Sequence, residues 1–141
     1  MKWHVFSVGH ARGDDFEPMV REYAGRINRK VLLEIRVFPD EAGMDRAIGD
    51  GRRRILLTEH GSQPVSSDDF SRRIEALLSR ENRDIVFVIG GSHGHSDAFL
   101  QKAHDRLSLS NLTLPHRLAR LMLVEQLYRA LSILAKEPYH H

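Results

Sequence analysis

The segment Asp84-Ile85-Val86-Phe87-Val88-Ile89-Gly90-Gly91 carries the strongest structural signal in the chain. Its five consecutive β-branched or aromatic residues are typical of a strand, and the glycine pair indicates where this strand ends. A strand that is apolar on both faces predicts a position in the middle of a parallel sheet that helices cover on each side. Ligands of open α/β sheets bind beyond the carboxyl ends of such strands, so the glycines are candidates for a ligand site.

Strands and helices are predicted to alternate along the rest of the chain. Strands rich in apolar and β-branched residues are predicted at 3–8, 31–38, 54–58 and 106–109. Helices are predicted at 14–29, 41–50, 66–80, 96–104 and 115–135, where apolar residues recur at helical spacing and residues such as Ser66 and Pro115 suit a first turn. This alternation predicts one α/β domain over residues 1–141, with a mostly parallel sheet and helices on both faces.

The composition excludes several classes of protein. The 141 residues include no cysteine, which excludes a disulfide scaffold, a thiolate zinc site and a cysteine nucleophile. No stretch approaches the ~20 apolar residues of a membrane span, and the first residues lack the apolar core of a signal peptide. We therefore expect a cytoplasmic protein without a membrane partner. The net charge of +2 does not by itself indicate a nucleic-acid partner.

Segments that follow predicted strands are expected to meet at one edge of the sheet, namely Leu57–Gly61, Ile89–Gly94 and Leu109–Pro115. Gly90 and Gly91 would let a backbone approach a ligand closely, although a tight turn would use the same glycines. The segment Leu109–Leu114 mixes apolar side chains with hydroxyls and backbone amides, which suits an adenine ring, and a fifth strand with its connection is the alternative. His93 and His95 lie in the glycine loop, but the chain has no recognised metal-ligand pattern, so we predict no metal.

The last predicted helix is apolar around most of its circumference. One side can pack on its own sheet, and a second subunit is the natural cover for the other side, so we predict a homodimer. The alternative is a helix sunk in the core of a monomer, which is hard to arrange in 141 residues. On this helix Glu125 precedes Arg129 by four residues, the favoured order for an ion pair, and a structural and a functional role both remain open.

Several motifs occur together and in a fixed order: Ile89-Gly90-Gly91-x-x-Gly94, Leu107 to His116, Glu125-Gln126-Leu127-Tyr128-Arg129-Ala130 and Pro138-Tyr139-His140. With Val8-Gly9 and Leu57-x-x-x-Gly61, this set resembles the RlmH family of ribosomal RNA methyltransferases over essentially the whole chain. The resemblance implies a SPOUT-type fold with a trefoil knot near the C-terminus, and a homodimer. Sequence physics alone would not predict the knot, because threaded chains are nearly absent from proteins.

The resemblance also implies an activity and a set of site residues. It implies that the chain uses S-adenosylmethionine (SAM) to methylate N3 of a pseudouridine in helix 69 of 23S rRNA, on the assembled ribosome. The active-site residues that it implies are Glu125, Arg129, Tyr139 and His140. The residues that it implies around SAM are Leu57, Gly90, Gly91, Leu109, Ser110, Asn111, Leu112, Thr113 and Leu114.

These implied residues suit the chemistry of such a reaction. SAM carries an activated methyl group, so the protein must chiefly position the RNA nitrogen and help its proton to leave. His140 is the first candidate for the base and Glu125 the second, while water could also serve. Arg129 is expected to stabilise negative charge on the neighbouring carbonyl oxygens, and Tyr139 to stack on the base.

The alternative function is a non-catalytic nucleotide- or ribosome-binding module of α/β fold, which would bind without transferring a methyl group. The chain also departs from the family pattern at two places. Family members often carry an acidic residue and a following leucine where this chain has Ser92-His93-Gly94-His95, and they usually end in arginine or lysine where this chain has His141. We expect these changes to alter contacts with rRNA more than SAM binding.

Overall fold

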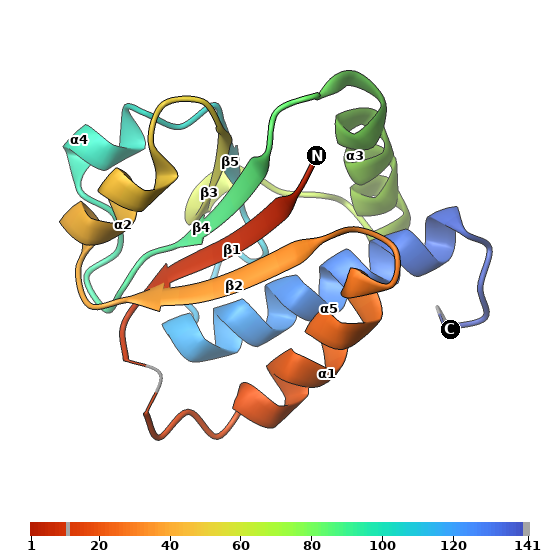
Figure 1. Ribbon diagram of the computed structural model, residues 1–141, viewed down its shortest axis with the longest axis horizontal. Coiled ribbons are helices and arrows are strands. Elements are labelled where there is room, and N and C mark those ends of the chain that lie inside the picture. The colour runs from red at the N-terminus through yellow and green to blue at the C-terminus, as the bar shows by residue number, and fades with distance from the viewer. Residues whose placement is uncertain (11, 140–141) are drawn as a thin grey trace.

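The computed structural model describes residues 1–10 and 12–139 of the chain. A parallel sheet in the order β2-β1-β4-β3-β5 forms its centre (Figure 1). The strands are β1 (Trp3–Val8), β2 (Leu33–Phe38), β3 (Arg53–Ser62), β4 (Ile85–Ile89) and β5 (Asp105–Leu107). They alternate with the helices α1 (Glu17–Asn28), α2 (Glu41–Ile48), α3 (Ser67–Arg80), α4 (Asp97–Leu100) and α5 (His116–Leu134). The predicted α/β fold with a parallel sheet is confirmed.

Strand β4 lies between β1 and β3, and all five of its residues are buried. Successive side chains of a strand point to opposite faces of the sheet. Accordingly, Ile85 and Phe87 belong to one hydrophobic core, whereas Val86 and Val88 belong to the other. The prediction of a central strand covered on both faces is therefore confirmed.

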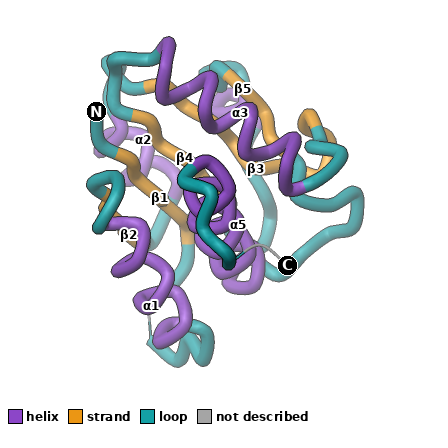
Figure 2. The backbone as a smooth tube through the Cα atoms, turned by 90° about the vertical axis from the view of Figure 1, so that its right-hand side faces the viewer, coloured by secondary structure: helices purple, strands orange, loops and turns teal. Residues whose placement is uncertain are grey.

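Helices α1, α3 and α5 cover one face of the sheet, and α2 and α4 cover the other (Figure 1). Helix α5 runs between α1 and α3 and contacts both (Figure 2). Its apolar flanks are thus covered within the chain, as in the monomer-core alternative, while Leu118, Met122 and Ile133 stay half-buried. The homodimer stays a prediction.

Within the described part of the chain, no helix has the length and apolar character that a membrane crossing requires.

A buried ion pair fastens α5 to the start of α1. Arg120 donates from Nη1 to the carboxylates of Asp14, at 3.0 Å, and of Glu17, at 2.8 Å. The other oxygen of Asp14 accepts a hydrogen bond from the Phe16 amide at 2.9 Å. Because this side chain holds a turn ahead of the helix, α1 begins at Glu17 and not at Asp14, where it was predicted to begin.

Strand β3 continues past its predicted end at residue 58 because it pairs with β5 a second time. Leu107 pairs with Leu57 and again with Ser62, so the register shifts over residues 58–61. The Ser108 amide then donates to the Ser62 carbonyl at 3.1 Å. Strand β5 ends at Leu107, two residues before its predicted end.

Gly61 makes this close approach of β3 to β5 possible. A Cβ atom at Gly61 would lie 2.7 Å from the carbonyl carbons of Arg106 and Leu107, a separation at which two backbones would have to move apart. The two chain segments therefore touch backbone to backbone, which only glycine permits. This close wrapping fits the trefoil knot that the resemblance implies, and the knot itself stays a prediction.

Replacing Arg120 with alanine is expected to lower the free energy of unfolding by about 3–5 kcal/mol, because the buried carboxylate of Asp14 would lose its partner. Arg21→Ala is the matched control, since its ion pair with Glu17 lies at the surface and its loss should cost less than ~1 kcal/mol. Urea unfolding followed by circular dichroism measures both variants. Equal losses in the two would show that the buried pair does not hold α5 on α1.

Candidate active site

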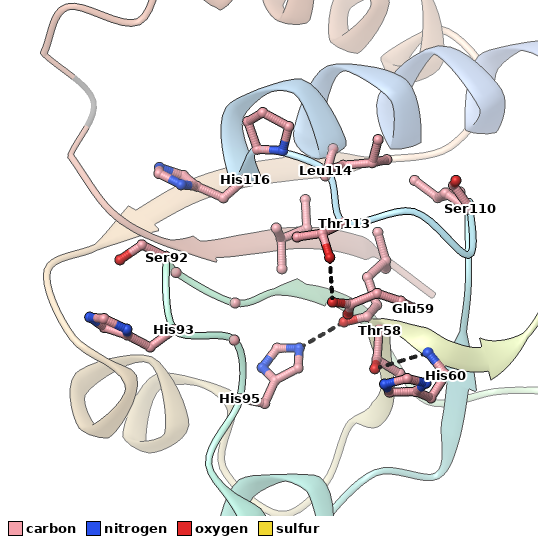
Figure 3. A pocket seen from close by; sticks show the side chains of 18 of the residues that line it. Thr58, Glu59, His60, Ser92, His93, His95, Ser110, Thr113, Leu114 and His116 are labelled. Carbon is pink, nitrogen blue, oxygen red and sulfur yellow. Dashed lines mark hydrogen bonds between the residues drawn. The ribbon is translucent and has the colours of Figure 1, made fainter.

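The carboxyl ends of β3 and β4 and the segment after β5 surround a cavity of about 850 Å³ (Figure 3). Parallel strands end here, and the volume is in the range of pockets that bind small molecules. The wall consists of Leu57–His60, Ile89–His95, Leu100, Leu109, Ser110, Leu112–His116 and Ala119. Eight of the nine residues predicted to surround SAM lie on this wall, and Asn111 does not. Their role in binding stays a prediction.

The glycines after β4 turn the chain back on itself. A Cβ at Gly90 would lie 2.8 Å from the carbonyl carbon of Gly94, and Gly91 and Gly94 form an antiparallel bridge. Gly94 has a φ of +71°, which glycine adopts without steric cost. The tight turn, the alternative explanation of these glycines, is therefore present. It also leaves bare backbone at the cavity wall.

The segment between β5 and α5 forms a third wall and is held by its own hydroxyl groups. Ser108 donates to the Ser110 carbonyl at 2.8 Å, and the Leu112 amide donates to the Ser110 hydroxyl at 3.0 Å. Thr113 donates to the Glu59 carboxylate at 3.3 Å and so joins this wall to β3. The Leu112 side chain is 75% exposed and offers an apolar surface that a bound ring would cover.

The charged and titratable groups of the cavity are Glu59 and the four histidines His60, His93, His95 and His116. Hydrogen bonds from its own backbone amide and from Thr113 lower the pKa of Glu59, so its carboxylate is ionised at neutral pH. The sequence predicted a ligand-facing segment at Leu57–Gly61 but did not indicate a role for Glu59. Carboxylates at such strand ends can accept hydrogen bonds from ribose hydroxyls. Among residues 1–10 and 12–139, no three potential metal ligands come together.

Three of the predicted catalytic residues form a second group, near the end of α5. Glu125 Oε1 accepts hydrogen bonds from Arg129, at 3.0 Å from Nε and 2.6 Å from Nη2, and from the Tyr139 hydroxyl at 3.0 Å. The Arg129 guanidinium lies 5.0 Å from the centre of the Tyr139 ring. The Tyr139 hydroxyl is also hydrogen-bonded to Tyr23 of α1 at 3.0 Å, so the tail is docked. Burial raises the pKa of Tyr139, and the phenol therefore stays neutral.

The group Glu125–Arg129–Tyr139 is not part of the cavity wall. Ala119 is the last residue of α5 on the cavity wall, and Glu125 follows it by six residues, which is ~9 Å along the helix axis. One chain therefore presents the cavity and the group Glu125–Arg129–Tyr139 as two separate places, which the sequence did not indicate. The fourth predicted catalytic residue, His140, lies outside the described residues.

The chain is similar to one known family over its whole length. The family described as "Predicted SPOUT methyltransferase" matches residues 1–140. A relative from Anaeromyxobacter sp. (strain Fw109-5), named "Ribosomal RNA large subunit methyltransferase H", is 41% identical, with 99% of each chain covered.

Solved structures share the fold at much lower identity. A "probable methylase family protein" from Haemophilus influenzae has a TM-score of 0.64 at 13% identity, covering 99% of this chain and 70% of that one. The methyltransferase AviRb from Streptomyces viridochromogenes, solved with AdoMet, has a TM-score of 0.50 at 13% identity, covering 95% of this chain and 58% of that one. With a parallel sheet, a cavity at its carboxyl edge and a relative that matches from end to end, the chain belongs to the SPOUT methyltransferases, among the large subunit methyltransferases H.

Proposed function

We propose that the chain transfers a methyl group from SAM to N3 of a pseudouridine in helix 69 of 23S rRNA, on the assembled ribosome in the cytoplasm. Membership of its family makes it a SAM-dependent methyltransferase of large-subunit rRNA. The atom, the helix and the ribosomal context rest on the resemblance of its motifs. The observation that carries the proposal is the cavity whose wall contains eight of the nine residues predicted to surround SAM.

The cavity wall offers suitable partners for the different parts of SAM. Leu109, Leu112 and Leu114 provide aliphatic surface for an adenine ring. The ionised carboxylate of Glu59 is an acceptor for ribose hydroxyls, and the bare backbone of the Gly90–Gly94 turn lets a ligand approach closely. SAM itself supplies a methyl group that needs no activation by the protein. The chain's own task is to bind and orient it.

The separation of the two sites favours a homodimer as the active form. Helix α5 fixes the group Glu125–Arg129–Tyr139 at a distance from the cavity of its own chain. A twofold dimer built on the half-buried side chains Leu118, Met122 and Ile133 would bring this group of one subunit toward the cavity of the other. In the proposed assembly, each active site therefore combines two chains.

The proton on N3 needs a base within hydrogen-bond reach. Glu125 already accepts hydrogen bonds from Arg129 and Tyr139, so we assign it the task of orienting both side chains. Arg129 then stabilises negative charge that develops on the carbonyl oxygens beside N3. His140 remains our candidate for the base, because an imidazole titrates near neutral pH.

The proposed function is tested by incubating the protein with labelled SAM and with ribosomes that lack this modification. We expect label in 23S rRNA, and mass mapping of the RNA should place one methyl group on the pseudouridine of helix 69. Free 23S rRNA serves as the comparison for the ribosomal context. SAM binding without any transfer would contradict the proposal and favour the non-catalytic binding module.

Gly90→Val is expected to weaken SAM binding at least about tenfold, because its side chain meets the Gly94 backbone and strains the turn that forms the wall. Gly25→Val is the control, since a Cβ at Gly25 on α1 has no atom within 4 Å. Calorimetric titration of both folded variants with SAM gives the affinities. If Gly90→Val binds SAM with wild-type affinity, the glycine turn is not part of the proposed SAM site.

Mixed dimers test whether each active site combines two chains. Gly90→Val disables the cavity and Arg129→Ala disables the group on α5, so each variant alone should be inactive in the ribosome assay. When the two are co-expressed in equal amounts, half of the dimers are mixed and each mixed dimer keeps one intact composite site. We therefore expect about a quarter of the wild-type rate. No activity in the mixture, or a monomer by light scattering, would rule out the composite site.

A further inference from the structure

His95 occupies an unusual position in the loop after β4. Its Nε2 lies 2.9 Å from the carbonyl oxygen of Leu57, in the middle of β3. A carbonyl oxygen only accepts hydrogen bonds, so Nε2 must carry a proton. The other ring nitrogen, Nδ1, is buried and has no hydrogen-bond partner among the described residues. The neutral tautomer with its proton on Nε2 is therefore the form that fits this site.

The His95 ring joins three parts of the structure around the cavity (Figure 3). Its hydrogen bond holds the glycine loop against β3, although the two residues are 38 positions apart in the chain. Its flat face stacks on Phe99 of α4, with ring centres 5.5 Å apart and planes 25° apart. The neighbouring residue Ser96 is anchored to Glu41 of α2 by its amide, at 3.0 Å, and by its hydroxyl. The end of the loop is therefore held by β3 through His95 and by α2 through Ser96.

Charges near His95 act in opposite directions on its protonation. Glu41 on α2 and Glu59 on β3 both attract a proton to the ring, but burial opposes the charged form more strongly and lowers the pKa of His95. The buried Arg54 guanidinium lies over the Phe99 ring, 5.4 Å from the ring centre. A second ring proton would sit on the buried Nδ1 without an acceptor, and an unsatisfied buried donor costs about 1–3 kcal/mol. Protonation would therefore push the ring out of its place.

We propose that His95 is a positioning residue of the SAM cavity: in its neutral form it fastens the Gly90–Gly94 turn to Leu57 of β3 and so holds two walls of the cavity in place relative to each other. This role rests on the proposed function, because it takes the cavity to be the SAM site. A leucine at position 95 would have no donor for the Leu57 carbonyl and no proton to gain. SAM binding by this chain consequently depends on pH in a way that a leucine in this position would not produce.

Two substitutions of His95 separate the hydrogen bond from the shape of the ring. Gln can donate its side-chain amide to the Leu57 carbonyl and does not titrate, whereas Phe keeps a ring against Phe99 but has no donor. His10→Gln is the control, because His10 is exposed and lies outside the cavity wall. Each protein is titrated with SAM in a calorimeter from about pH 8 down to the acid side of the usual histidine range.

We expect wild-type affinity for SAM to fall about tenfold on the acid side, and the His10→Gln variant to show the same fall. His95→Gln should bind within about threefold of wild type at the upper pH and lose the acid-side fall, while His95→Phe should bind about tenfold more weakly at every pH. If His95→Gln keeps the acid-side fall, or if His95→Phe binds SAM as tightly as wild type does, His95 does not position the cavity. Either result would leave the assignment of the cavity as the SAM site standing. If the wild type binds no SAM at any pH, the proposed function fails, and this role fails with it.

Discussion

The backbone contact between Gly61 and residues 106–107 determines how the candidate site is assembled. The ends of β3 and β4 are neighbours because their strands pair in parallel, but two walls do not enclose a ligand. The third wall is available because β3 pairs with Leu107 twice, with no side chain at Gly61 to separate the two backbones, which brings the chain after β5 beside β3. Thr113 then reaches Glu59, and α5 starts at the cavity. A larger separation between Gly61 and residues 106–107 would leave the cavity open on one side.

Helix α5 acts as a rigid spacer between the cavity and the group Glu125–Arg129–Tyr139. Its 19 residues span about 28 Å, and α1 holds it near both ends. At the first end Arg120 is paired with buried Asp14, and at the second end Tyr139 is hydrogen-bonded to Tyr23. Motion of a loop within one chain cannot shorten a distance that a packed helix sets. The same packing that stabilises the fold therefore also sets the separation between this group and the cavity.

Local patterns in the sequence predicted the order of the elements and the position of β4, because alternation and glycine spacing act on residues close along the chain. Contacts between distant segments had no such signal. The polar residues Thr58–Gly61 do not resemble a strand, and they extend β3 only because Leu107 lies beside them. The three segments that form most of the cavity wall were predicted from their positions after strands, whereas the assignment of their residues to SAM came from the family resemblance. Glu59 and the contact from His95 to Leu57 were missed because one carboxylate or one imidazole carries no pattern of its own.

The third wall, α5 and the tail come last in the chain, and this order has a consequence for biosynthesis. A growing chain emerges from its N-terminus, so residues 109–139 leave the ribosome after every other part of the fold. Until they do, the core side chains that pack on Leu123 and Leu127 face water, and the cavity has only two of its walls. Newly made copies therefore pass through a stage with a large apolar face and an incomplete cavity. A copy whose translation stops before residue 109 would stay at that stage, with the apolar face exposed to water and without the third wall.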